Sequence, residues 1–147
     1  MSEEKTYVFG ESGANSIISA LAPMYIKKSY SSDPFFANSK IIYSIYKDNF
    51  ECPIKEGFEK RALFNGIEEA DTELLVGPTL NTETLHKMAV NFSDAVINAS
   101  DTISEELELY IKGKNIPYLP YAEENTHENY WNFFTQIYPV LNEENND

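Results

Sequence analysis

The sequence predicts a single α/β domain in which a parallel β-sheet is flanked by helices. Two observations support this prediction. Short apolar segments alternate along the chain with amphipathic helical patterns, and this order is typical of parallel sheets. The clearest of these segments shows little alternation of polar and apolar residues, as expected of a strand buried on both faces. A chain of 147 residues, 42% of them hydrophobic, is also large enough to bury a core of its own.

Three buried strands are expected in the sheet. The clearest is residues 40–46 (KIIYSIY), which is rich in β-branched and aromatic residues. Residues 95–98 (AVIN) form the second and residues 116–119 the third. Residues 6–9 are a further short strand near the N-terminus, where they could cap an open edge of the sheet.

The first half of the chain carries one clear helical pattern. Apolar residues recur at helical spacing over residues 17–26, and Pro23 is expected to kink this helix or to mark a late first turn. Residues 48–78 are irregular, apart from a helix around residues 56–65.

Three helices are expected in the second half, at residues 85–92, 103–111 and 124–138. Residues 81–84 (NTET) can cap the first of them. Ser100 or Thr102 is expected to cap the second, and Gly113 is its expected C-cap. Glutamates lie early in that second helix and lysines lie at its end, which matches the helix dipole.

Charge and composition restrict the partners. The formal net charge is −13, from 24 acidic and 11 basic residues, and such a surface repels phosphate backbones and anionic lipid. We therefore expect neither nucleic acid nor a membrane as partner. Residues 1–141 are expected to form the domain, and residues 142–147 (NEENND) an acidic, disordered tail.

The expected cellular location rests on three features that the sequence lacks. No apolar run approaches the ~20 residues of a membrane helix. The N-terminus (MSEEKTY) does not resemble a secretory signal peptide. Cys52 is the one cysteine, so no internal disulfide can form. A cytoplasmic protein is expected.

Residues suited to catalysis are few. His86 and His127 are the two histidines, and their spacing from Cys52 does not match a metal site. We interpret His86 as a helix-surface residue and His127 as exposed near a helix start. Cys52 lies between Glu51 and Pro53, which is not the electropositive setting of a reactive thiol. No catalytic residue and no metal ligand is predicted.

Glycine motifs and acidic pairs add no site. Residues 10–13 (GESG) follow a strand and precede a helix, where a phosphate can bind, but the glutamate opposes an anion. We interpret them as a strand–helix turn and expect no cofactor. Acidic pairs such as Glu68-Glu69 are interpreted as solvated faces, because two-carboxylate hydrolysis needs a buried acid.

Four segments resemble the glycogen and starch synthase family. Residues 19–28 (SALAPMYIKK) resemble the family helix that carries Thr-Ala-Leu-Ala-Pro. Residues 33–50 (DPFFANSKIIYSIYKDNF) are similar to the segment whose strand ends in Thr-Val/Ile-His-Asn. Residues 88–100 (MAVNFSDAVINAS) are similar to the segment that ends in Thr-Val-Ser-Pro. Residues 104–121 (SEELELYIKGKNIPYLPY) resemble the variant in short glycogen synthase-like proteins of Bacteroidetes-type bacteria. The resemblance covers about residues 19–138.

The resemblance implies a fold and an activity. It implies a Rossmann-like sheet that forms part of the N-terminal domain of a GT-B glucosyltransferase. Such enzymes transfer glucose from ADP- or UDP-glucose to the end of an α-1,4-glucan with retention, in a cleft between two Rossmann-like domains.

The departures from the family bear on activity. The Lys-x-Gly-Gly-Leu nucleotide-binding loop has no counterpart, and neither does the C-terminal domain that holds the sugar nucleotide. The family histidine falls on Tyr46, the asparagine after it on Lys47, and the serine of Val-Ser-Pro at Ser100. We expect a truncated glucosyltransferase domain that is inactive alone. The alternatives are a non-catalytic glucan-binding or protein-interaction module, and a chain that keeps the fold without a function.

The candidate site lies beyond the C-terminal ends of the strands, where open α/β sheets bind ligands. The residues there are Tyr46, Lys47, Ser100, Asp101 and Tyr121. Tyrosine rings can stack on a pyranose and the polar groups can bind its hydroxyls, so the expected ligand is an α-glucan rather than a nucleotide. A homo-oligomer or a missing complementary domain is expected to cover the open flank of the sheet.

Overall fold

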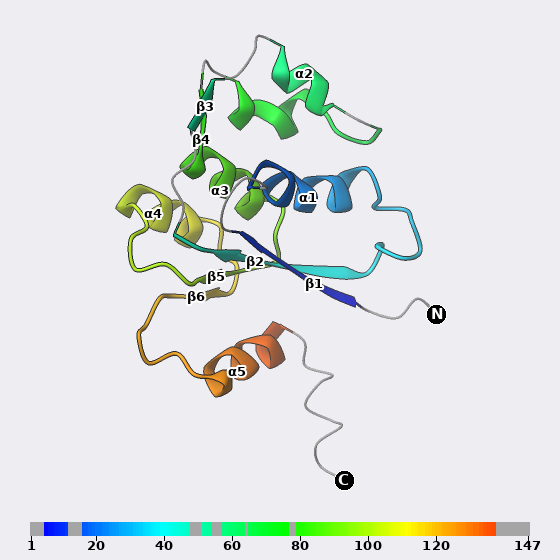
Figure 1. Cartoon of the computed structure of the whole chain (residues 1–147). Coiled ribbons are helices and arrows are strands. Elements are labelled where there is room, and N and C mark those ends of the chain that lie inside the picture. Colours follow the sequence, from blue (N-terminus) through cyan, green and yellow to red (C-terminus); the bar gives the residue numbers. More distant parts are fainter. Residues whose placement is uncertain are drawn as a thin grey trace.

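The computed structural model describes residues 5–11, 16–47, 51–53, 57–63, 65–76 and 79–137. Its main sheet has four parallel strands in the order β1-β2-β5-β6. These strands are Lys5–Glu11, Ser39–Ile45, Ala95–Asn98 and Tyr118–Leu119. Helices α1, α3 and α4 cover one face and α5 covers the other (Figure 1). The predicted α/β fold with a parallel, Rossmann-like sheet is confirmed. The predicted tail lies outside the described residues.

The strand boundaries differ slightly from the predicted ones. β2 ends at Ile45 rather than at residue 46, because Tyr46 leaves the sheet and is exposed. β6 begins at Tyr118 rather than at residue 116. Pro117 precedes it and has no N–H to donate, although its carbonyl still accepts the Val96 N–H at 3.0 Å. β1 is longer than predicted and pairs with β2 at the edge of the sheet, so the N-terminal strand does cap that edge.

β2 lies at the centre of the core. Its residues from Ile41 to Ile45 are all buried, as the apolar segment predicted. Alternate side chains point to opposite faces of a sheet. Accordingly, Tyr43 and Ile45 pack into the cluster beneath α1, α3 and α4, whereas Ile42 packs into the cluster beneath α5.

Helix α1 (Ser16–Lys28) continues through Pro23. Seven residues precede this proline in the helix, so it does not mark a first turn. Because proline has no N–H, the carbonyl of Ser19 cannot receive its usual intrahelical bond. Lys27 Nζ near the end of the helix lies 2.7 Å from Asp94 Oδ2 and 3.1 Å from the Ser39 carbonyl, which fixes α1 to the start of β2.

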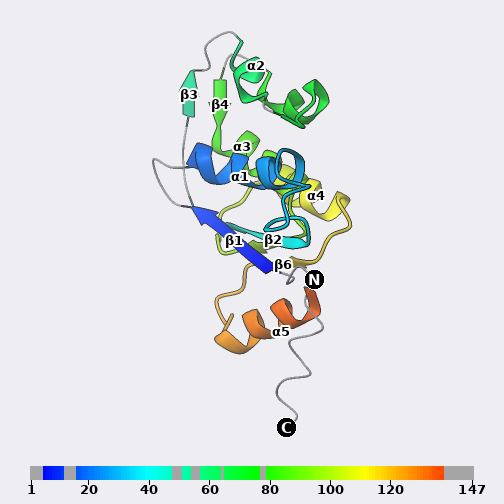
Figure 2. The same ribbon diagram turned by 90° about the vertical axis from the view of Figure 1, so that its right-hand side faces the viewer.

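The middle of the chain forms a small layer beyond α1 and α3 (Figure 2). It contains a two-stranded antiparallel sheet and a 3₁₀ helix, which the sequence did not predict, and a short α-helix within the predicted helix of residues 56–65. These elements are β3 (Glu51–Pro53), α2 (Phe58–Ala62), the 3₁₀ helix η1 (Glu69–Leu75) and β4 (Thr79–Asn81). Tyr25 Oη donates to the Ala62 carbonyl at 3.1 Å, and Lys28 Nζ lies 3.1 Å from Asp71 Oδ1. Both contacts join this layer to α1.

Helices α3 (Thr82–Asn91) and α4 (Glu105–Gly113) begin with side-chain caps. Asn81 Oδ1 accepts the Thr84 N–H at 2.9 Å, so the predicted NTET cap is confirmed. The prediction of Ser100 or Thr102 as the cap of α4 is wrong. Ser104 Oγ caps this helix by accepting the Leu107 N–H at 3.0 Å.

The end of α4 also differs from the prediction. Gly113 is still helical, Lys114 is the C-cap, and Asn115 takes the left-handed conformation with φ of 54°. Asparagine tolerates this conformation better than most residues, so it replaces the expected glycine. The last helix, α5, spans His127–Ile137 and is shorter than predicted. No helix within the described ranges is long and apolar enough to cross a membrane.

Candidate functional site

The predicted site residues follow three neighbouring strands at one edge of the sheet. Ile45 is in register with Asn98, and Ile97 is in register with Leu119, so β2, β5 and β6 end side by side. The loops that leave these strands carry the predicted residues, which are Tyr46, Lys47, Ser100, Asp101 and Tyr121. The structure therefore brings them to a single edge, which we call the C-terminal edge.

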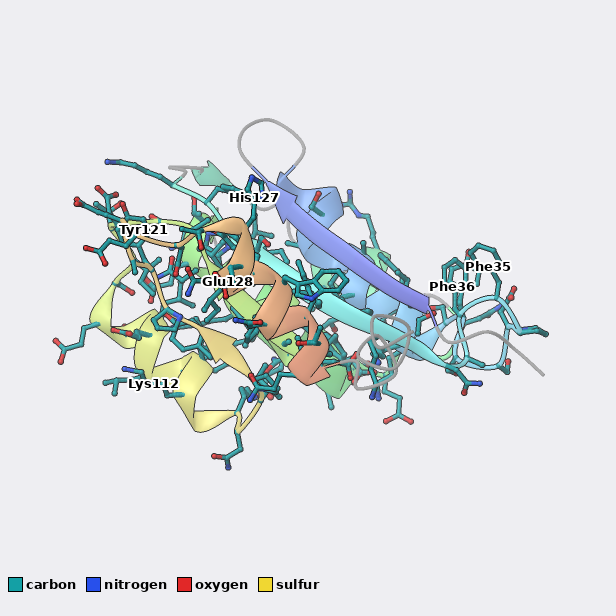
Figure 3. All side chains as sticks on the ribbon, turned by 90° about the horizontal axis from the view of Figure 1, so that it is seen from below. Phe35, Phe36, Lys112, Tyr121, His127 and Glu128 are labelled. Carbon is teal, nitrogen blue, oxygen red and sulfur yellow. The ribbon has the colours of Figure 1, made fainter. Side chains whose placement is uncertain are left out.

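Two tyrosines are open to solvent at this edge. Tyr46 is 44% exposed and Tyr121 is 40% exposed. Tyr46 directly follows the buried strand β2, and Tyr121 follows the partly buried strand β6 after Pro120. Figure 3 shows Tyr121 at the opposite end of the sheet from Phe35 and Phe36. Exposed aromatic rings at the end of a packed sheet are available to stack on a ligand.

An ion pair connects the loops after β2 and β5. Lys47 Nζ lies 3.9 Å from Asp101 Oδ1, and both side chains are largely exposed. Such a pair contributes little to stability, because solvent screens it. The pair can therefore open at little cost, and its ammonium and carboxylate groups can then form hydrogen bonds with the hydroxyls of a polar ligand.

The loop after β5 is held by hydrogen bonds within itself. Asn98 is buried, and its Oδ1 accepts the Ser100 N–H at 2.9 Å. Ser100 is also buried, and its Oγ accepts the Thr102 N–H at 3.2 Å. Ser100 therefore shapes the loop that carries Asp101. Sequence reasoning missed Asn98, although a polar residue at the end of an apolar strand was a visible signal.

Asn98 also connects β5 to β6. Its Nδ2 donates to Tyr118 Oη at 3.4 Å. Burial raises the pKa of the Tyr118 phenol above 10.0, and the hydrogen bond from Asn98 acts in the opposite direction. The phenol is therefore uncharged at neutral pH, which leaves a neutral hydroxyl beneath the C-terminal edge.

The charge of the edge is negative. The described loops after β2, β5 and β6 are residues 46–47, 99–104 and 120–126, and Lys47 is their only basic residue. They carry three carboxylates, Asp101, Glu123 and Glu124. A diphosphate would be repelled here, whereas a neutral sugar would not. No group of three or more histidine, cysteine or acidic residues in the described part of the chain could hold a metal ion.

The two histidines have different surroundings. His127 is exposed and begins α5, as predicted (Figure 3). The prediction of His86 as a surface residue is wrong. It is buried, and its Nδ1 lies 2.9 Å from Tyr43 Oη. The reason is that α3 packs against α1, α4 and β2 together, so its buried stripe is wider than the apolar spacing indicated. The side chain of Cys52 lies outside the described residues.

Comparison with protein families agrees with this architecture. A parallel sheet with helices on both faces is consistent with the Rossmann-like fold of glycosyltransferases. The family model for the starch synthase catalytic domain matches residues 15–116, which is more than half of the chain. The chain belongs to this family. No curated protein and no solved structure matches it. The match contains Tyr46, Lys47, Ser100 and Asp101 and ends before Tyr121.

Proposed function

We propose that the C-terminal edge binds an α-1,4-glucan, and that the chain takes part in glucosyl transfer as the part that holds the glucan. The observation that carries this proposal is the pair of exposed tyrosines, Tyr46 and Tyr121, at the same edge of the sheet as the Lys47–Asp101 ion pair. Membership of the starch synthase catalytic domain family supports the glucan as ligand.

The chemistry of the edge suits a neutral sugar. A tyrosine ring presents an apolar face, which matches the C–H face of a pyranose, and a phenol that can form a hydrogen bond. The Asp101 carboxylate can accept from sugar hydroxyls and the Lys47 ammonium can donate to them. Asn98 and Ser100 hold the loop of Asp101 in place, so this carboxylate needs little reordering on binding.

The same edge is a poor site for the sugar nucleotide. Transfer requires stabilisation of the leaving diphosphate by positive groups or backbone N–H donors. Lys47 is the single cation of the described loops and already has a carboxylate partner. We therefore propose that the sugar nucleotide is bound by a separate domain or partner, and that this chain alone does not transfer glucose.

Binding is tested by calorimetry and by NMR titration with maltoheptaose and, separately, ADP-glucose. We expect maltoheptaose to bind and to shift the signals of Tyr46 and Asp101, with a weaker effect of ADP-glucose. Tyr46→Ala and Tyr121→Ala should each weaken maltoheptaose binding about tenfold, which corresponds to about 1.4 kcal/mol.

Tyr30→Ala is the matched control. Tyr30 is 43% exposed, almost the same as Tyr46, but it lies in the loop between α1 and β2. Its substitution should leave maltoheptaose binding unchanged. The proposal fails if maltoheptaose does not bind, if ADP-glucose binds more tightly, or if Tyr30→Ala weakens binding as much as the two edge variants do.

A further inference from the structure

β1 is an edge strand with one described neighbour. All seven of its residues are in parallel register with β2, from Lys5 opposite Ser39 to Glu11 opposite Ile45. Among the described strands none lies on its other side. An edge strand of this length presents a row of backbone N–H and C=O groups that can pair with another strand.

The hydrogen bonds of the sheet indicate which residues of β1 face outward. The Ala99 N–H donates to the Ile45 carbonyl at 2.8 Å, so Ile45 directs its backbone groups toward β5. Successive residues direct these groups to opposite sides, so Ile42 directs its own toward β1. In a parallel pair such a residue bonds to the two residues that flank its register partner, which is Val8. Val8 therefore faces outward, as do the residues two positions before and after it.

We propose that β1 pairs with β1 of a second copy of this chain, antiparallel and about a two-fold axis at Val8. The outward-facing residues then form hydrogen-bonded pairs across the axis, and the main sheet continues from one copy into the other. This register sets the strand against its own sequence read backwards, with the pairs Lys5–Glu11, Thr6–Gly10 and Tyr7–Phe9.

The register argues for a second copy rather than an unrelated strand. It sets a basic residue opposite an acidic one at both ends of the interface, Lys5 against Glu11 and the reverse. Moving the axis by one residue, to Tyr7 or Phe9, still pairs outward-facing residues with one another but removes both Lys5–Glu11 pairs. A two-fold contact of this kind is self-complementary and closes as a dimer. Because the chain carries a net charge of −13, two local pairs of opposite charge favour this one orientation against general repulsion.

This inference is independent of the proposed glucan site. The C-terminal edge is formed by the loops after β2, β5 and β6, whereas the interface uses the outer side of β1. A dimer formed in this way would carry two copies of the edge, both open to a polysaccharide.

Charge exchange tests the register. Sedimentation velocity on the full chain over a series of concentrations should show a reversible dimer. Lys5→Glu and Glu11→Lys each set like charges opposite one another and should each shift the chain to monomer. The double variant Lys5→Glu/Glu11→Lys restores both pairs and the original net charge, so it should restore the dimer. A wild-type chain that stays monomeric, or a double variant that does not recover, overturns the proposal.

Hydrogen exchange tests the interface itself. In the dimer, the amide of Val8 should be protected, and in the monomeric Lys5→Glu chain it should exchange rapidly. The amides of Tyr7 and Phe9 bond to β2 and should stay protected in both, which also shows that β1 remains folded. Val8→Pro removes an outward N–H without breaking the pairing with β2 and should abolish the dimer. If the Val8 amide of the dimer exchanged as fast as it does in the Lys5→Glu chain, the dimer interface would lie elsewhere and the proposal would be wrong.

Discussion

The two faces of the main sheet are covered to different depths. One face lies beneath α1, α3 and α4, with the α2 and η1 layer beyond them (Figures 1 and 2). Its buried cluster draws on all three helices, with Met24 from α1, Met88 from α3 and Leu107 from α4. Among the described helices, α5 alone covers the opposite face. The cluster there joins Ile42 and two residues of β5 to Phe133.

This difference shows how unevenly the core is distributed. On the three-helix face, the buried cluster contains side chains from several helices and strands. The loss of one of these side chains therefore leaves contacts between the other elements in place. On the α5 face, Phe133 is the one buried hydrophobic residue that the helix contributes, and Tyr130, Phe134 and Ile137 of the same helix pack against the cluster while partly buried. The family match ends at residue 116, so it covers the three-helix face and leaves α5 outside. The two faces can therefore be tested separately.

The largest effect is expected on the α5 face. Phe133→Ala removes the large buried side chain that α5 contributes and should lower the free energy of unfolding by about 3–5 kcal/mol. Trp131→Ala is the control in the same helix, because Trp131 is about half exposed and should cost less than about 0.5 kcal/mol. Urea unfolding followed by circular dichroism measures both. Equal losses in the two variants would show that α5 does not dock through Phe133.

A comparable loss of stability is expected on the three-helix face. Leu107 is 3% exposed and Leu109, two residues later in α4, is 63% exposed. Leu107→Ala should therefore cost about 2–5 kcal/mol, whereas Leu109→Ala should be close to neutral. An unchanged urea midpoint for Leu107→Ala would mean that α4 packs by another side.

The main sheet was predictable because its strands are apolar runs. Residues 95–98 were predicted without error, and β2 within one residue, since strands buried on both faces leave a continuous apolar signature. β3 and β4 were missed because three-residue strands are too short to show a period.

The candidate site was predictable in position more than in detail. The rule that loops after parallel strands gather at one edge placed Tyr46 and Tyr121 together on that edge. It did not reveal Asn98 or the buried state of Ser100, because their hydrogen bonds depend on how the loop backbone folds back. His86 was misplaced for a similar reason, since its burial follows from tertiary packing around α3.

A smaller effect should test how the outer layer joins the three-helix face. Gly66 has φ of 88°, and a Cβ placed there would lie 2.7 Å from the Lys28 carbonyl oxygen at the end of α1. Gly66→Ala should therefore cost about 2–3 kcal/mol, from backbone strain and from displacement of α1.

Gly57→Ala separates these two causes. Gly57 has a similar φ of 81°, but no atom lies within 4 Å of a Cβ placed there. Its substitution should cost only the backbone strain, about 1–2 kcal/mol. Thermal unfolding of the two variants gives the difference directly. If Gly57→Ala cost as much as Gly66→Ala, the contact with α1 would contribute nothing.

The smallest effect concerns the contacts between α3 and α4 on the three-helix face. Lys87 Nζ lies 2.5 Å from Glu106 Oε1 and 3.3 Å from Glu83 Oε1. The hydrogen bond to Glu106 is the main cause that raises the pKa of Lys87 above its ordinary value of 10.5, while burial acts in the opposite direction. The folded chain therefore holds this proton more tightly than the unfolded chain does.

The sign of the pH dependence follows from that difference. The stabilisation is complete below pH 10.5 and is lost as the pH rises through the higher pKa of the folded state. Glu106→Ala should lower the free energy of unfolding by less than about 1 kcal/mol at neutral pH, because Glu106 is mostly exposed, and should make the alkaline decline shallower. Glu105→Ala removes the same charge from the same helix and should keep the wild-type slope, because Glu105 is an exposed residue of the first turn of α4. Urea unfolding from neutral pH to about pH 11 measures the slopes, and an unchanged slope in Glu106→Ala would rule out Lys87 as the titrating group.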